Sequence, residues 1–236
     1  MTMKLDVHGL NSYYGGAHIL SDLHLKADTG EVVALLGRNG AGKSTTFASL
    51  VGLVSKCHGT ILFNGEEICG KPTHEIARMG LGYVPEDRRI FTDLTVEENL
   101  LVGQQDDREG VRGWTTEMIF EFFPNLAEMR KRPGGQMSGG EQQMLTIART
   151  LMGNPLLVLL DEPSEGLAPK IVEEMAKAIL EMKNHGLSVV ISEQNLHFAR
   201  LISDRAYIIE KGCIRFDGTM KELEEHEEIS NAYLAV

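Results

Sequence analysis

The octapeptide "GRNGAGKS" carries residues at a spacing that can bind the phosphates of a nucleotide. Gly37, Gly42, Lys43 and Ser44 fit the pattern G-x-x-x-x-G-K-[ST], directly after an apolar run at 32–36. Glycines let backbone N–H groups turn toward phosphate oxygens, the lysine neutralises β- and γ-phosphate charge, and the hydroxyl can ligate Mg²⁺. A glycine-rich turn that binds nothing is the alternative, but it would not require the lysine and the hydroxyl. We therefore expect a site for ATP and Mg²⁺, with these nucleotide-binding residues: Gly37, Arg38, Asn39, Gly40, Ala41, Gly42, Lys43, Ser44 and Thr45.

Two carboxylates follow the apolar run "LLVLL" in the segment 156–162. A buried strand here would deliver Asp161 and Glu162 to the carboxyl edge of a parallel sheet, where ligands bind in open α/β folds. We expect Asp161 to hold Mg²⁺ together with Ser44, and Glu162 to act as the general base toward the attacking water. A solvated strand end is the alternative, and the phosphate loop upstream makes the functional interpretation the stronger one.

The heptapeptide "MSGGEQQ" predicts a second anion site. Ser138 and Glu141 form the pattern of a capping box, which by itself explains a capped structural helix. It does not explain Gly139 and Gly140, because glycine lowers helix propensity by roughly 1 kcal/mol per residue. We expect the four residues 138–141 to bind a phosphate of a nucleotide held by another chain, so that two chains enclose two ATP molecules and hydrolysis reopens the pair.

The elements that must position these motifs differ along the chain. Segments "KLDVHGL" and "LHLKA" alternate apolar and polar residues, which predicts an antiparallel sheet with one wet face. The runs at 32–36, 156–162 and 188–193 are nearly continuous and apolar, which is typical of strands buried on both faces in a parallel sheet. Helical spacing over 170–183 places a helix between the last two runs.

The middle of the chain, approximately 87–155, has no comparable run and contains "TVEENLLVG", where Thr95 and Glu98 form a capping box. The sequence thus predicts an α/β fold: a P-loop NTPase core with a mainly parallel sheet, an N-terminal antiparallel β-subdomain and an inserted helical subdomain. We expect one domain over 1–236, with the helical subdomain at approximately 87–155 within it. The tail from 220 onward predicts an acidic helix and a short ending.

Composition limits the function. The chain has 236 residues, 42% of them hydrophobic, and its formal net charge is −11, which argues against broad electrostatic binding of nucleic acid. No run approaches the roughly 18 apolar residues of a membrane span, so any role at a membrane would be that of a peripheral subunit. Cys57, Cys69 and Cys213 have no metal-ligand spacing and suggest ordinary reduced thiols.

Four motifs together resemble the ATP-binding subunits of ABC transporters: the loop 37–44, "MSGGEQQ", the strand ending in "DEP", and "SEGL" directly after it. The resemblance spans essentially the whole chain. It implies that Tyr14, or its neighbour Tyr13, stacks on adenine, and that the segment 164–167 crosses the interface of the ATP-bound dimer.

Two positions depart from the common pattern of that family. Glu86, in "GYVPEDRRIF", stands where most members have glutamine, and Gln194, in "SEQN", stands where most have histidine. The resemblance implies that both face the γ-phosphate side of the site. Glu86 could ligate Mg²⁺ or contact water, and Gln194 could donate a hydrogen bond to the γ-phosphate, so we count both with Glu162 among the catalytic residues.

The motifs "YVPE", "LTVEENL", "EQN" and "NAYLAV" resemble one branch, the ATPases of branched-chain (hydrophobic) amino-acid uptake, while "YYGGAHIL" and "PSEGLAPKIV" also resemble urea and short-amide uptake ATPases. This resemblance implies transmembrane permease subunits, a second ATPase subunit that is identical or different, and, indirectly, a periplasmic or extracellular solute-binding protein. It places the chain at the cytoplasmic face of the cell (inner) membrane. We expect the segment after Glu86, through about Leu100, to contact a permease helix, because it joins the γ-phosphate site to the helical lobe; an ordinary connection between the lobes is the alternative.

Two other classes fit the sequence less well. Soluble ABC ATPases of DNA repair or translation resemble coiled-coil or fused tandem proteins, and this acidic chain has neither sustained heptads nor a second cassette. A P-loop kinase would leave "MSGGEQQ" unexplained.

Overall fold

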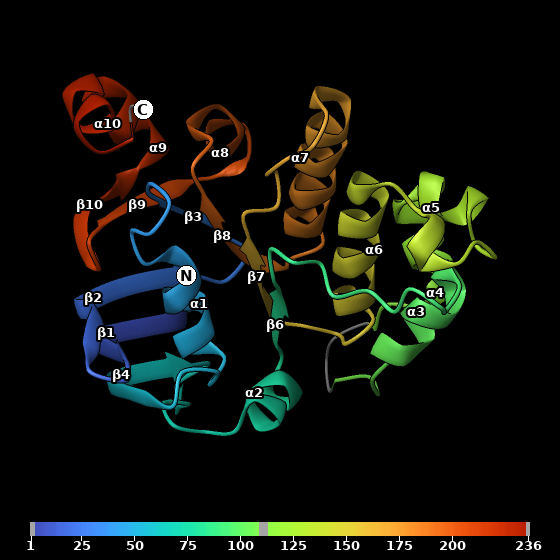
Figure 1. Cartoon of the computed structure of the whole chain (residues 1–236), viewed down its shortest axis with the longest axis horizontal. Helices are drawn as coiled ribbons and strands as arrows, with labels where there is room; N and C mark the ends of the chain where they lie inside the picture. The colour runs from blue at the N-terminus through green and yellow to red at the C-terminus, as the bar shows by residue number, and fades with distance from the viewer. Residues whose placement is uncertain (1–2, 109–112, 235–236) are drawn as a thin grey trace.

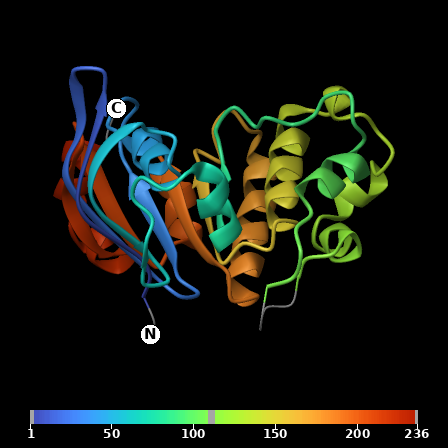
Figure 2. The same ribbon diagram turned by 90° about the horizontal axis from the view of Figure 1, so that it is seen from below.

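Two β-sheets with helices packed on them make up residues 3–108 and 113–234, the part of the chain that the structure, a computed structural model, describes (Figure 1). The sequence expectations for residues 1–2 and for the end of "NAYLAV", at 235–236, lie outside the described residues. The N-terminal strands and the helices of the middle segment lie at opposite ends of the molecule in both ribbon views (Figures 1 and 2).

The first sheet is antiparallel, with strand order β2-β1-β4-β5. Its strands are β1 (Met3–Tyr14), β2 (Ala17–Asp28), β4 (Lys56–Phe63) and β5 (Glu66–Glu67). Leu23, Leu25 and Ala27 of β2 are fully buried, and the residues between them are less so. The alternating pattern therefore correctly predicted an N-terminal antiparallel sheet with one buried face.

The second sheet has strand order β10-β9-β3-β8-β7-β6. Its strands are β3 (Val32–Leu36), β6 (Leu81–Val84), β7 (Leu157–Asp161), β8 (Ser188–Glu193), β9 (Arg205–Glu210) and β10 (Cys213–Thr219). All neighbours pair in parallel except β9 and β10. The three apolar runs of the sequence are the central strands β3, β8 and β7, which confirms their prediction.

Helices cover both faces of this parallel sheet. Among them are α1 (Lys43–Leu50), α2 (Thr73–Met79), α7 (Pro169–Asn184), α8 (Leu196–Ile202), α9 (Met220–Glu225) and α10 (Glu227–Tyr233). Helix α7 connects β7 to β8, as expected for a strand–helix–strand unit. The tail differs from the single helix expected there, because the chain breaks at His226 between α9 and α10.

In the described part of the chain, five helical elements lie between β6 and β7: α3 (Val96–Gly103), α4 (Thr116–Phe122), α5 (Pro124–Glu128), the 3₁₀ turn η1 (Gly134–Gln136) and α6 (Gly139–Leu151). The capping box of Thr95 and Glu98 is present at the start of α3. Figures 1 and 2 show α6 next to α7, with α3, α4 and α5 on the far side of α6. The boundaries of a separate helical subdomain at about 87–155 stay a prediction.

The core is divided by the parallel sheet into two clusters. Val158 and Leu160 of β7 face the cluster that contains α6, α7 and α8, whereas Leu157 and Leu159 face the cluster with α1 and the first sheet. Because successive side chains of a strand point to opposite faces, a strand buried on both sides must be apolar throughout. The sheet thereby fixes the carboxyl ends of β3, β6, β7 and β8 in a rigid frame.

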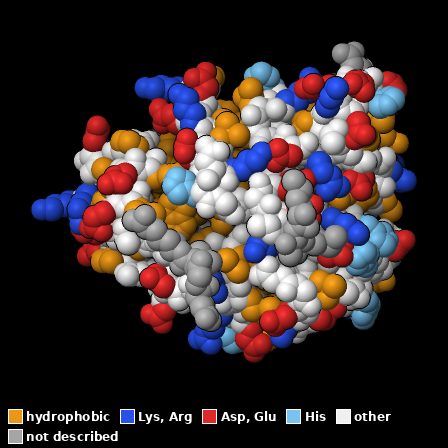
Figure 3. Space-filling view, turned by 180° about the vertical axis from the view of Figure 1, so that it is seen from behind, with side chains coloured by type: hydrophobic (Ala, Val, Ile, Leu, Met, Phe, Trp, Pro, Cys, Tyr) orange, Lys and Arg blue, Asp and Glu red, His pale blue; other side chains and the backbone are white. Residues whose placement is uncertain are grey.

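None of the described helices is long and apolar enough to cross a membrane. On the face shown in Figure 3, Lys and Arg side chains are interspersed with Asp and Glu side chains. The described residues of that face form no continuous basic surface of the kind that tracks a nucleic-acid backbone.

Candidate functional site

The loop after β3 is held so close to its neighbours that two of its glycines are required. A Cβ on Gly37 would lie 2.6 Å from the carbonyl oxygen of Ile209, and one on Gly42, whose φ is +117°, would lie 2.9 Å from Leu20 Cδ2. Gly42 also caps α1 without any side-chain hydrogen bond. The first N–H groups of α1 are therefore left for another acceptor, which is the arrangement of a phosphate site at a helix N-terminus.

Lys43, the first residue of α1, points back into this loop. Its Nζ donates to the carbonyl oxygens of Gly37 (2.7 Å) and Arg38 (3.2 Å) and lies 3.0 Å from Glu162 Oε1. The side chains of Lys43 and Glu162 are only 3% and 8% exposed, so solvent screens their attraction little. The predicted phosphate-binding lysine is thus paired with the predicted general base.

Glu162 itself has an uncommon backbone conformation. Its φ is +47°, in the left-handed region that a residue with a Cβ rarely adopts. Its N–H donates to the backbone carbonyl and to the hydroxyl of Ser192, each at 3.1 Å. Backbone strain of this kind is found where the surrounding structure imposes it, most often at functional sites.

Asp161, one residue earlier, is buried and accepts three hydrogen bonds. Ser192 Oγ and Ser44 Oγ donate to Oδ1 at 2.5 and 3.2 Å, and the hydroxyl of Tyr83 donates to Oδ2 at 3.2 Å. Burial raises the pKa of Asp161, while these three hydrogen bonds act in the opposite direction. The Ser44 hydroxyl and the Asp161 carboxylate are hard oxygen donors in hydrogen-bond contact, a set that suits Mg²⁺.

Ser192 and Glu193, at the end of β8, were not identified from the sequence, which pointed only to the adjacent Gln194. Glu193 is 2% exposed, and its carboxylate accepts from the amides of Ser164 (3.0 Å) and Asn195 (3.3 Å). Their place at the end of a predicted strand could have identified Ser192 and Glu193 as site residues. Both residues end an apolar run next to the run that ends in Asp161, and neighbouring parallel strands end at the same edge.

The other predicted γ-phosphate residues lie at the rim of this group. Gln194 is half-buried between Glu193 and Asn195, and Glu86 is exposed. The pKa of Glu165, in the loop after β7, is raised to about 7. The largest cause is its hydrogen bond to Glu162, followed by burial and then by the charges of Glu162 and Glu86. The role of Glu86 as a metal ligand or catalytic residue stays a prediction, as does the catalytic role of Gln194.

The two candidate adenine-stacking tyrosines differ in their surroundings. The ring of Tyr13 stacks on His18 with ring centroids 4.4 Å apart, and Lys56 Nζ lies 4.6 Å from the centre of the same ring. Tyr14 is 52% exposed. An aromatic platform for a base needs a free face, so the structure favours Tyr14 as the stacking residue.

"MSGGEQQ" forms the N-terminus of α6. Ser138 Oγ accepts from the amide of Glu141 at 3.4 Å, and Glu141 Oε2 accepts from the amide of Ser138 at 2.6 Å, so the predicted capping box is present. The double glycine has a packing cause within the chain. A Cβ on Gly140 would lie 2.8 Å from Ile171 Cγ2 of α7, and one on Gly139 would lie 2.5 Å from the flexible Arg88 guanidinium. Packing thus explains Gly140, while Gly139 remains compatible with a phosphate contact.

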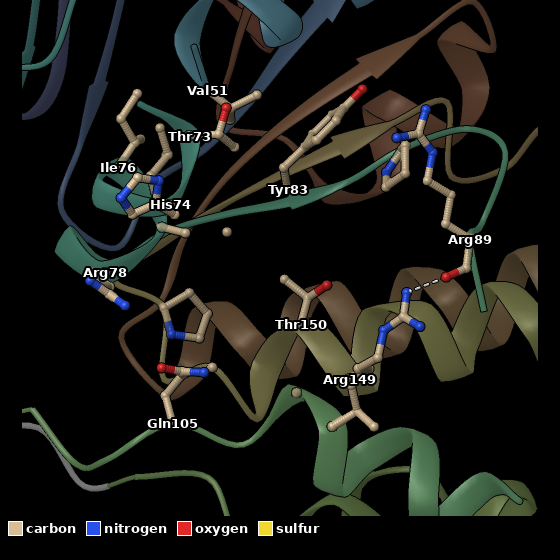
Figure 4. Close-up of a pocket in the computed structure, with 18 of the residues that line it drawn as sticks. Val51, Thr73, His74, Ile76, Arg78, Tyr83, Arg89, Gln105, Arg149 and Thr150 are labelled. Carbon is tan, nitrogen blue, oxygen red and sulfur yellow. Dashed lines mark hydrogen bonds between the residues drawn. The ribbon is translucent and has the colours of Figure 1, made fainter. Parts of the chain in front are cut away.

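A groove of about 680 Å³ lies beside the site, lined by residues from α2, β6, α3 and α6 (Figure 4). Leu53, Phe91 and Val102 line it and are about half exposed, at 51%, 47% and 52%. Tyr83 also lines it and donates its hydroxyl hydrogen to Asp161. The groove therefore has an apolar surface and a direct link to the buried carboxylate.

Arg149 is the most buried cation of this groove. Its Nη2 donates to the carbonyl oxygen of Arg89 at 2.7 Å, drawn in Figure 4, and its guanidinium lies 5.1 Å from the centre of the Phe91 ring. Its Nη1 is buried without a hydrogen-bond partner among the described residues. A buried donor without an acceptor is unfavourable, so this nitrogen suits an acceptor from a molecule seated in the groove.

Comparisons with known proteins extend over nearly the whole chain. A family model described as "ABC transporter" matches residues 20–165. The chain is 42% identical over 229 residues to the high-affinity branched-chain amino acid transport ATP-binding protein BraG of Pseudomonas aeruginosa, covering 95% of this chain and 97% of that protein. It is 38% identical over 234 residues to the lipopolysaccharide export system ATP-binding protein LptB of Haemophilus influenzae, covering 98% and 96%. The crystal structure of an ATP-binding cassette of an ABC transporter in its ADP conformation matches with a TM-score of 0.82 at 26% identity, covering 95% and 94%.

Proposed function

The chain belongs to the ABC transporter family of ATP-binding proteins, whose members hydrolyse ATP, and from this premise we propose that it powers the uptake of branched-chain amino acids. Its fold is that of the family, an antiparallel N-terminal sheet and a largely parallel core sheet with helices. The observation that carries the proposed solute is the 42% identity with BraG over 95% of the chain. The 38% identity with LptB makes lipopolysaccharide export the second candidate.

Within the nucleotide site, the chain's own residues divide the work. The loop from Gly37 to Thr45 surrounds the phosphates, and Lys43 exchanges its contact with Glu162 for the β- and γ-phosphate oxygens. Ser44 and Asp161 would hold Mg²⁺, which when bound would neutralise charge on the phosphates. Glu162, released from Lys43, accepts the proton of the attacking water. Gln194 and Glu86 orient the γ-phosphate and water, and Tyr14 stacks on adenine.

Two copies of the ATPase, identical or different, enclose two ATP molecules in our proposal. Ser138, Gly139, Gly140 and Glu141 contact the γ-phosphate held by the opposite subunit. The capping box occupies the amides of Ser138 and Glu141, and within the described residues the amides of Gly139 and Gly140 have no acceptor. These two amides support the role, because a helix N-terminus attracts an anion. In the single chain, α6 and the phosphate-binding helix α1 lie on opposite sides of β6 and β7, so one chain does not close its own site (Figure 1).

The groove is the proposed contact with the transmembrane permease. It includes Phe91 and adjoins the segment from Glu86 to Leu100, which the sequence suggests for this role. A helix with an apolar face would cover Leu53, Phe91 and Val102, and one carboxylate or carbonyl oxygen on it would accept a hydrogen bond from Arg149 Nη1. The chain then sits peripherally at the cytoplasmic face of the cell membrane, and the solute-binding protein contacts it only through the permease.

Solute uptake in the source cells tests the proposal. Deleting this chain should abolish ATP-dependent uptake of radiolabelled leucine, isoleucine and valine. The wild-type chain should restore that uptake, and Lys43→Ala should not, since it lacks the phosphate-binding ammonium. Loss of urea or short-amide uptake with normal leucine uptake would assign the neighbouring branch. A defect confined to lipopolysaccharide export would contradict import.

A further inference from the structure

Glu193 is a buried carboxylate that contacts three loops of the nucleotide site. Its Oε1 accepts from the amide of Ser164 at 3.0 Å, and its Oε2 accepts from the amide of Asn195 at 3.3 Å. Its backbone carbonyl accepts from the amide of Gly37, the first residue of the phosphate loop, at 3.2 Å. Each of these loops follows a different strand, β7, β8 and β3, so Glu193 joins segments far apart in the sequence.

The burial of the Glu193 carboxylate requires compensating interactions. Burying a charged group is unfavourable unless hydrogen bonds replace its water, and Glu193 is 2% exposed. Burial raises its pKa, whereas the bonds from the Ser164 hydroxyl, the Ser164 amide and the Asn195 amide favour the charged form. Only a group with two separate acceptor oxygens satisfies amides from two loops at once.

The two loops have distinct roles in the proposed reaction. Ser164 begins the segment 164–167, which faces the second ATPase copy in the proposed dimer. Asn195 directly follows Gln194, the residue proposed to contact the γ-phosphate, and its side chain caps α8 by accepting from the amide of Phe198 at 3.1 Å. Because Asn195 is fixed to both α8 and Glu193, a movement of Gln194 is passed to the carboxylate rather than absorbed by the loop.

We propose that Glu193 is a positioning residue that couples the loop of Gln194 to the segment 164–167. Contact of Gln194 with the γ-phosphate at one site would then determine the position of the segment 164–167, which reaches the second copy. The coupling rests on the proposed function, namely the ATP-bound dimer. Glu193 touches neither substrate nor metal in this role. Its effect is therefore on communication between two sites rather than on the affinity of one site for ATP.

Glu193→Gln tests this with little change of shape. The amide oxygen of glutamine can accept from one loop, but its Nε2 is a donor and faces the N–H of the other loop. We expect amide hydrogen exchange at Ser164 or Asn195 of the nucleotide-free chain to rise roughly 10–150-fold, the size expected for one lost hydrogen bond to a charged group. In ATP hydrolysis, the Hill coefficient should fall toward one and kcat should fall about tenfold, with KM unchanged within about threefold.

Glu173→Gln, which makes the same chemical change at an exposed position on α7, is the control and should alter none of these values. Unchanged exchange at both amides would overturn the proposal, since the carboxylate would then not hold either loop. Faster exchange with an unchanged Hill coefficient would overturn the coupling. Should Glu193→Gln not fold, Glu193→Asp, which keeps both oxygens but is one methylene shorter, takes its place with the same expected results.

Failure of the proposed function can be distinguished from failure of the proposed role of Glu193. If the wild-type chain neither dimerises with MgATP nor hydrolyses it with a Hill coefficient above one, the dimer is wrong and the coupling with it. The exchange measurement on the nucleotide-free chain still decides whether Glu193 holds the two loops.

Discussion

The buried ion pair between Lys43 and Glu162 predicts that Glu162, the proposed general base, competes with ATP for the lysine. The two charged atoms are 3.0 Å apart, and both side chains are more than nine-tenths buried. At an effective dielectric constant near 20, the gross attraction is about 5–6 kcal/mol. Lys43 must give up this contact, and keep only the carbonyls of Gly37 and Arg38, when its ammonium moves to a phosphate.

Glu162→Gln converts this competition into a measurable change. The glutamine oxygen still accepts from Lys43, but a neutral acceptor replaces a charged one. A hydrogen bond to a charged group is worth about 1.5–3 kcal/mol and a neutral one about 0.5–1.5, so Lys43 is released about 1–2 kcal/mol more easily. We therefore expect ATP to bind roughly 5–30-fold more tightly. Hydrolysis should fall by about 10²–10⁴-fold, because the general base is lost.

Equilibrium binding of a fluorescent ATP analogue in EDTA measures the first effect, since hydrolysis is suppressed in both chains. Glu173→Gln is the matched control, because it makes the same chemical change at an exposed position on α7 that forms no ion pair with Lys43 within the described part of the chain. Its ATP affinity should stay within about threefold of wild type. An unchanged or weaker affinity in Glu162→Gln would refute the competition, and retained hydrolysis would reject Glu162 as the base.

Three further predictions concern neighbouring features. Gly140→Ala gains about 1 kcal/mol of helix propensity but puts a Cβ 2.8 Å from Ile171 Cγ2. Overpacking costs about 1–3 kcal/mol and should outweigh the gain, so the melting temperature should fall by a few degrees. A higher melting temperature in calorimetry would contradict the packing role of Gly140. The pKa of Glu165 is raised from 4.5 to about 7, so its contribution to stability is full below pH 4.5 and is lost as the pH rises through 7. Glu165→Gln should therefore flatten the fall of the melting temperature between pH 4.5 and 7. A pH profile of the melting temperature that is unchanged by the substitution would contradict the raised pKa. Tyr14→Ala should weaken binding of the ATP analogue by about 1 kcal/mol, roughly fivefold, and Tyr13→Ala should weaken it less; the reverse order would assign adenine to Tyr13.

Local motifs were readable from the sequence because each is fixed by neighbours along the chain. The phosphate loop, the capping boxes at Thr95 and Ser138, and the apolar strands require only the residue types within a few positions. Asp161 and Glu162 could also be proposed as site residues, since a carboxylate pair at the end of a buried strand suits a metal ion and a water once the chain also carries a phosphate loop. The parallel sheet followed from strands that are apolar on both faces.

The contacts within the site were decided by the tertiary structure. Asp161 meets Ser44, Tyr83 and Ser192, which come from three other segments of the chain, because β6, β7 and β8 are neighbours in the sheet and α1 begins at the same edge. Strand order depends on which crossovers pack best, and no local pattern records it.

Contacts between segments far apart in the sequence also explain where the predictions from sequence and the structure differ. The double glycine of "MSGGEQQ" by itself indicates an approaching phosphate, yet Gly140 is required by Ile171 of a helix that begins about thirty residues later. Glu193 carried no motif of its own, and only its burial between two loops reveals it. The sequence by itself determined which chemistry the chain can do, because chemistry needs particular residue types at short spacing. The tertiary structure decided which residues position that chemistry, because burial and contact are properties of the packed chain.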